Sequence, residues 1–129
     1  MTARIQRKRT KGWRMPPNTA YVSRPSLFSN AYRVSDFGAE LAVALFRESA
    51  QGCWYPRQTD QCTDAQKNAA YVAHSTLMHR FERMTLAEAA RVYLRGKNLA
   101  CWCALEDEQG SRVPCHADVL LELARQVTP

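Results

Sequence analysis

The most specific chemistry in this sequence lies in three cysteines and one histidine near its C-terminus. Cys101 and Cys103 form a Cys-x-Cys pair, and Cys115, which His116 follows directly, lies twelve residues after Cys103. Thiols and an imidazole at this spacing are typical of two kinds of site, a metal centre or the reactive cysteine of a small enzyme. Either kind of site requires the chain to fold so that the two segments meet.

A zinc site is the first interpretation of this cluster. Side chains at positions i and i+2 of an extended segment point to the same face, so Cys101 and Cys103 can approach one ion while Trp102 points the other way, into packing. Cys115 and His116 lie at an expected helix start, where backbone amides and the helix dipole favour a thiolate. Three thiolates and one imidazole form the Cys3His ligand set of a closed, structural zinc site.

Two other interpretations of the same residues remain open. Cys115 is a candidate nucleophile, with His116 as its general acid or base. In that case Asp118 either interacts with the helix dipole or orients His116. The simplest interpretation is that the cysteines pack as small hydrophobic side chains beside a histidine.

A second pair of cysteines lies in the middle of the chain. Residues 51–63 are expected to form an irregular, polar loop that contains Cys53 and Cys62. These two cysteines could close a second site with His74 or His79, although their spacing does not require one.

Strand signals occur at three places. The β-prone segments 19–22 and 98–102 are bounded by turn residues and predict strands, and 98–102 is typical of a buried strand. The segment 4–15 is an expected edge strand or hairpin arm, which a Pro-Pro-Asn turn ends.

Helix signals are stronger. Asp36, Thr63 (or the neighbouring Asp64) and Thr85 are expected N-caps, and Glu88 completes a capping box with Thr85. Apolar periodicity predicts four helices, over 38–49, from the cap at 63 or 64 to about 81, over 85–94 and over 115–127.

These elements predict a small single-domain α/β layer fold over residues 1–129, with a short sheet of three or four strands and three or four packed helices. Residues 1–16 form its basic N-terminal arm or edge strand. The chain shows no internal repeat and no low-complexity tract.

Positive charge is concentrated in the N-terminal third. Residues 1–35 carry eight Lys or Arg and no Asp or Glu, and the whole chain has a net charge of +6. Such a concentration favours nucleic acid or a nucleotide as partner, although a solvated basic arm shows the same pattern. We expect base stacking on Trp13 and phosphate contacts from the neighbouring basic residues Arg4, Arg7, Arg9, Lys11 and Arg14.

The composition limits the compartment. No apolar run approaches the roughly 18 residues of a membrane span, and the basic N-terminus lacks the apolar segment of a secretory signal. We therefore expect a cytoplasmic protein with no membrane partner, inside the host cell if a phage encodes it. Its five cysteines are then reduced, metal-bound or catalytic rather than paired in disulfides.

Four segments share a pattern with a known family. They are 4–16, 21–26, 94–103 with its Cys-Trp-Cys, and 114–120 with its Pro-Cys-His-Ala-Asp. In these segments the chain resembles the domain of unknown function number 4326, an uncharacterised phage and bacterial family. The resemblance implies a small phage-associated α/β protein without an established reaction. The family's Lys-Trp-Gly-Asn-Pro-Phe-like stretch corresponds to residues 27–32 here, where only Asn30 is identical.

An enzyme that acts on a nucleotide or phosphorylated metabolite is the alternative function. Loops after parallel strands gather at the carboxyl edge of a sheet, which brings Arg24, Ser26 and Asn30 toward the cysteines. Arg24 would then bind a phosphate and Asn30 would orient the substrate. Cys115 or His116 would carry out the chemistry at a helix start that favours anions. A further alternative is a phage accessory factor or inhibitor that binds a host protein.

Overall fold

A computed structural model of the chain describes residues 3–24, 26–50, 62–81 and 84–125. The elements in chain order are β1 (Arg4–Gln6), β2 (Thr19–Tyr21), α1 (Val34–Phe37), α2 (Ala39–Ala50), α3 (Asp64–His79), α4 (Leu86–Tyr93), β3 (Asn98–Cys101) and α5 (His116–Arg125). The predicted α/β fold is confirmed: the described residues form three parallel strands and five helices.

The sheet has the order β1-β3-β2, and β3 pairs in parallel with both neighbours. Leu99, Ala100 and Cys101 of β3 are buried, as expected for a central strand that is covered on both faces. All three strands run in the same direction, so their carboxyl ends meet at one edge of the sheet. Residues 7, 22–24 and 102–103 leave the sheet at this edge.

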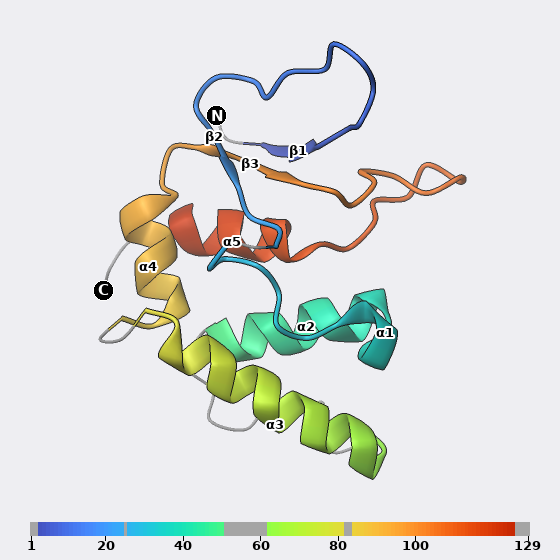
Figure 1. Cartoon of the computed structure of the whole chain (residues 1–129), viewed down its shortest axis with the longest axis vertical. Helices are drawn as coiled ribbons and strands as arrows, with labels where there is room; N and C mark the ends of the chain where they lie inside the picture. The colour runs from blue at the N-terminus through green and yellow to red at the C-terminus, as the bar shows by residue number, and fades with distance from the viewer. Residues whose placement is uncertain (1–2, 25, 51–61, 82–83, 126–129) are drawn as a thin grey trace.

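Helices cover one face of the sheet. Figure 1 shows α5 directly beneath the strands, α2 and α3 further below, and α4 beside α5, whereas residues 7–18 run on the opposite side. The core lies between the sheet, α5 and α2, and its largest fully buried side chains include Tyr32, Phe46, Leu45, Leu99, Leu120 and Leu123. The face of the sheet away from α5 is therefore covered by the basic segment and not by a helix.

In place of the start of the helix predicted over 38–49, the structure has two helices, α1 and α2, that meet at Gly38. Gly38 has a φ of +81°, a left-handed conformation that glycine adopts without a Cβ clash. It separates the short α1 from α2, and Asp36 lies inside α1 rather than acting as an N-cap. The predicted Asp36 cap is thus wrong, because the chain already turns into helix at Val34.

The other two predicted caps are confirmed. The Oγ1 of Thr63 accepts from the backbone N–H of Gln66 at 3.2 Å, and the Oγ1 of Thr85 accepts from that of Glu88 at 3.1 Å. Both helices carry the reciprocal side-chain contact of a capping box. Most of the predicted 51–63 loop, with Cys53, and the last residues of the predicted 115–127 helix lie outside the described residues.

None of the helices in the described residues combines the length and the hydrophobicity that crossing a bilayer requires.

Candidate metal centre and adjoining pocket

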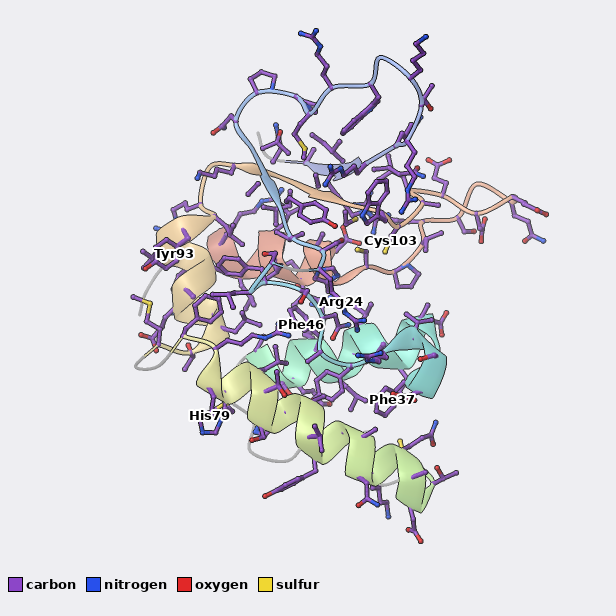
Figure 2. The ribbon with its side chains drawn as sticks, viewed as in Figure 1. Arg24, Phe37, Phe46, His79, Tyr93 and Cys103 are labelled. Carbon is purple, nitrogen blue, oxygen red and sulfur yellow. The ribbon has the colours of Figure 1, made fainter. Side chains whose placement is uncertain are left out.

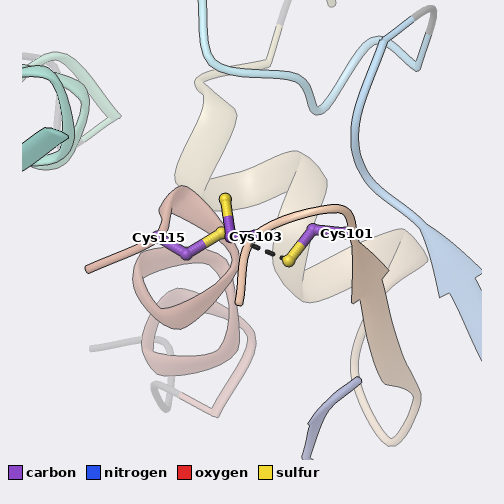
Figure 3. A group of neighbouring side chains, drawn as sticks. All are labelled: Cys101, Cys103 and Cys115. Carbon is purple, nitrogen blue, oxygen red and sulfur yellow. Dashed lines mark hydrogen bonds between the residues drawn. The ribbon is translucent and has the colours of Figure 1, made fainter. Parts of the chain in front are cut away.

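The three C-terminal cysteines come together where β3 ends and α5 begins. Cys101 is the last residue of β3, Cys103 lies two residues further on, and Cys115 directly precedes α5. Their Sγ atoms all lie within 4.8 Å of one another (Figure 3). The expectation that Cys101 and Cys103 point to the same side is met, because both sulfurs lie next to that of Cys115.

The thiols form a hydrogen-bonded cluster. The Sγ of Cys115 donates to the Sγ of Cys101 at 3.3 Å, and all three cysteines are free thiols. Cys101 and Cys115 are fully buried, whereas Cys103 is half-buried. Hydrogen bonds from Cys101 and Cys115 hold the pKa of Cys103 well below its usual range, whereas hydrogen bonds with Cys101 and Cys103, together with burial, raise the pKa of Cys115. Of these two thiols, Cys103 therefore loses its proton more readily than Cys115.

This arrangement bears on the choice of nucleophile. Cys115 is buried and has a raised pKa, so it is a poor source of thiolate. Cys103 has a lowered pKa and is partly open to solvent. Under an enzymatic interpretation the geometry favours Cys103 over the predicted Cys115.

His116 lies beside the cluster in a defined tautomer. Its Nε2 donates to the carbonyl oxygen of Val22 at 2.7 Å, and its Nδ1 lies 3.7 Å from the Sγ of Cys115. Burial lowers the pKa of His116, which favours the neutral ring, and the bond from Nε2 to Val22 leaves the lone pair of that ring on Nδ1. The ring packs edge-on against Phe46 at 5.5 Å. His116 nonetheless lies outside the set of ligand atoms that are all within 4.8 Å of one another.

The donor set fits a soft metal ion. Two thiolates on one tetrahedral zinc, each about 2.3 Å from the ion, lie about 3.8 Å apart. The Sγ atoms of Cys101 and Cys115, at 3.3 Å, need to move apart by only a few tenths of an ångström. The bond from His116 to Val22 is of the kind that metal-bound histidines make through their second nitrogen. Cys101, Cys103 and Cys115 can therefore hold an ion, with His116 as the nearest nitrogen.

Asp118 does not orient His116. Its carboxylate accepts from the guanidinium groups of Arg4 and Arg112, at 2.8 and 2.6 Å. The Arg4 side chain is completely buried, so it is not exposed as the predicted phosphate contact requires. The interactions of Arg4 hold β1 to the start of α5.

A pocket of about 430 Å³ adjoins the thiol cluster at the carboxyl edge of the sheet. Its lining includes Cys103 and His116, and it also includes Arg24 and Arg33 from the loop after β2. In the view of Figure 2, Arg24 lies between the ribbons of α5 and α2. The structure thus brings Arg24 and the cysteines to the same cavity, as expected for loops that follow parallel strands.

The two polar residues predicted with Arg24 have local roles. The Oγ of Ser26 accepts from the backbone N–H of Phe28. Asn30 donates from Nδ2 to the carbonyl of Ala42 at 3.1 Å and accepts from the N–H of Tyr32 at 2.9 Å. Asn30 lines the pocket, and its amide also ties the loop to α2.

On the other face of the sheet, arginines stack on aromatic rings. The guanidinium of Arg7 lies 4.7 Å from the ring centre of Tyr21 and 5.0 Å from that of Trp102, and Arg9 lies 4.9 Å from Trp102. These four residues are referred to below as the stacking cluster. Trp13 is half-buried in the same segment and Arg14 is exposed.

Trp102 was expected to point into packing, and the structure corrects this. Its side chain is 37% exposed, and its Nε1 donates to the hydroxyl of Tyr21 at 2.9 Å. Since Cys101 and Cys103 face α5, strand alternation places Trp102 on the face that no helix covers. That alternation was the sequence signal that Trp102 lies on the face away from α5.

A second metal site is absent from the residues that the structure describes. His74 is buried and lies 3.0 Å from the Oγ of Ser49 through its Nδ1, and the Nδ1 of His79 contacts the carbonyl of Ser75. Cys62 is half-buried away from the thiol cluster, and Cys53 lies outside the described residues.

Fold and site together define a small α/β domain with a candidate soft-metal centre beside a pocket at the carboxyl edge of its sheet. The family described as Domain of unknown function (DUF4326) matches residues 5–126. The chain belongs to this family, which confirms the resemblance found in its four motif segments. No curated protein and no solved structure matches the chain.

Proposed function

We propose that this protein binds single-stranded nucleic acid through the stacking cluster and the basic residues around it. We also propose that zinc on the cysteines stabilises the sheet that carries this surface. The observation that carries the nucleic-acid proposal is the position of Arg7 and Arg9 over the exposed indole of Trp102. A nucleobase stacks on guanidinium planes as well as on aromatic rings, and the arginines also offer the adjoining phosphates positive charge.

The chemistry of the stacking cluster favours unpaired bases. Proteins that bind single strands combine a basic track with aromatic side chains on which bases stack, and arginine adds cation–π attraction. A base inside a duplex presents only its edge, so a ring such as Trp102 contributes little to duplex binding. The cluster therefore favours single strands over double helices.

The charge around the cluster supports the same partner. Lys8, Arg9, Lys11 and Arg14 are exposed, and residues 1–35 contain no carboxylate side chain. Each phosphate contact releases counterions, which makes binding strongly dependent on salt. The basic segment supplies this sequence-independent affinity, while Trp102 and Tyr21 supply the contact with the bases.

Zinc fits the thiol cluster as a structural ion. Cys101 and Cys103 belong to the end of β3, and Cys115 belongs to the start of α5, so a bound ion would join the central strand to the helix beneath it. Zinc is the common ion for a set of thiolates with a nearby imidazole, and it supplies structural stability when all four positions are filled. We assign the fourth position to the Nδ1 of His116.

Binding of a fluorescent oligothymidylate, measured by anisotropy between about 50 and 200 mM salt, tests the nucleic-acid proposal. Arg9 is exposed, and its stacking contact is with Trp102. The Arg9→Ala variant should weaken binding and reduce the salt slope by about 0.7 for one lost phosphate contact. Trp102→Leu should weaken binding by about tenfold, because one base stack is lost.

Lys97→Ala is the matched control. Lys97 is an exposed cation at the opposite, amino end of β3, so its removal should change the affinity less than about twofold. Equal affinity of wild type and Trp102→Leu, or binding that salt does not weaken, would contradict the proposal. In that case a host protein becomes the stronger candidate partner.

A further inference from the structure

The pocket at the carboxyl edge of the sheet is separate from the stacking cluster and has a different character. The loop after β2 contributes Arg24 and Arg33, and α2 contributes Ala42 and Val43. The segment before α5 adds Val113 and Pro114 as its apolar residues. We propose that this pocket binds a phosphomonoester that carries an apolar ring system, a class that includes nucleoside monophosphates.

Uncompensated positive charge points to an anion. Arg24 and Arg33 line both this pocket and a neighbouring one of about 470 Å³, which Arg80 also lines. Within the described part of the chain, none of these three arginines forms an ion pair with a carboxylate. Burial and the nearby Arg24 lower the pKa of Arg80. Among carboxylic acids, Asp36 alone lines the second pocket and none lines the first, where the thiol with the lowered pKa, that of Cys103, is part of the lining.

The loop that carries Arg24 and Arg33 is held in place by hydrogen bonds within the protein. The indole Nε1 of Trp102 donates to the hydroxyl of Tyr21, and this hydroxyl donates to the backbone carbonyl of Arg24 at 2.7 Å. Arg80 donates to the carbonyls of Leu27, at 3.0 Å, and of Ser29. A loop fixed at both points loses little freedom on binding, which favours affinity.

The start of α5, which is also part of the lining, adds a contribution that favours an anion. His116 is the first residue of α5 and lines the pocket together with Ser23. The amino end of a helix favours negative charge through its backbone N–H groups and dipole. The arginines are able to make bidentate bonds to phosphate oxygens, which a lysine could not.

The rest of the lining selects for more than a bare phosphate. The side chains of Ala42, Val43, Val113 and Pro114 offer no charge, and the volume falls within the range of small-ligand pockets. A ligand with a phosphate at the arginines and a ring against these side chains uses both parts of the cavity. The proposed nucleic-acid surface is the stacking cluster on the other side of the sheet, so this proposal is independent of the proposed function.

Calorimetric titration of the full chain with adenosine monophosphate, adenosine and inorganic phosphate tests the proposal. Adenosine monophosphate should bind at least tenfold more tightly than either of its two parts. Arg24→Gln and Arg33→Gln should each weaken that binding by about tenfold, because each removes a charge-assisted pair. Both arginines are exposed, so unchanged thermal unfolding is expected for both variants. Lys97→Gln should bind as wild type does.

The same samples separate the two proposals. Arg33→Gln should keep the affinity for oligothymidylate while losing that for adenosine monophosphate, and Arg9→Ala should do the reverse. The pocket proposal is overturned if adenosine monophosphate does not bind. It is equally overturned if adenosine binds as tightly, or if both arginine variants bind as wild type does.

Discussion

Arg4 and Asp118 join the first strand to the last helix. The Nη1 of Arg4 donates to the Oδ2 of Asp118 at 2.8 Å, and the same guanidinium donates to three backbone carbonyls in the segment 104–113. The Arg4 side chain is completely buried, while Asp118 is 23% exposed and also pairs with Arg112. A cation from the most basic part of the sequence thus serves the fold, directly beside the thiol cluster.

Asp118→Ala should reduce the free energy of unfolding by about 2 kcal/mol, because it leaves the buried guanidinium of Arg4 without its counter-charge. Urea denaturation followed by circular dichroism measures the change. The three backbone carbonyls still accept from Arg4, so the variant should remain folded in the absence of urea.

Arg112→Ala provides the comparison for this pair. Arg112 is 59% exposed in its side chain and contacts the other carboxylate oxygen of Asp118, so its loss should cost less than about 1 kcal/mol. Equal losses in the two variants would show that burial of Arg4 does not set the strength of the pair.

The position of the thiol cluster could be predicted from the sequence. Residue alternation in a strand places Cys101 and Cys103 on one face, and a helix that starts at Cys115 returns to that face in an α/β layer fold. The burial of Arg4 could not be predicted in this way. Its partner Asp118 lies at the far end of the chain, and a basic segment gives no local signal of which arginine turns inward.

The surface role of Trp102 illustrates a second limit. A tryptophan between two cysteines on a buried strand is more often packed than exposed. Its exposure depends on which face of the sheet the helices cover, and this is a property of the whole topology. The Asp36 cap failed for a local reason, since the left-handed Gly38 divides one apolar stripe into two helices.

Zinc should stabilise the protein through its cysteines. At a free concentration about 100-fold above its dissociation constant, zinc should raise the free energy of unfolding by about 2.7 kcal/mol, and a chelator should remove this gain. The ion content of the purified chain, measured by elemental mass spectrometry, should be one zinc per chain. Cys103→Ser should abolish the stabilisation, because it removes one of the three sulfur ligands.

Cys62→Ser is the matched variant for the zinc experiment. Cys62 is a half-buried cysteine outside the cluster of three, so this variant should keep both the ion and the stabilisation. If zinc raises the stability of wild type and Cys103→Ser equally, the ion binds elsewhere and the thiol cluster is only part of the packing.

His74 gives the fold a dependence on pH that is separate from the metal centre. It is 6% exposed in α3, and its Nδ1 lies 3.0 Å from the Oγ of Ser49, which also bonds the hydroxyl of Tyr32. Burial lowers the pKa of His74 from 6.5. The folded state therefore keeps the neutral imidazole at a pH where the unfolded chain already binds a proton.

Acidification should for this reason destabilise wild type more than a His74→Gln variant, whose side chain stays neutral. Because the unfolded state binds more protons below pH 6.5, wild type loses at most about 1.4 kcal/mol per pH unit until the folded pKa is reached. His79 and His116 are present in both chains, so their effects cancel in the difference. Urea denaturation at about pH 7.5 and about pH 5.5 should show the stability advantage of wild type shrinking by about 1 kcal/mol. An advantage that stays constant or grows on acidification would mean that His74 is protonated as readily in the folded protein as in the unfolded chain.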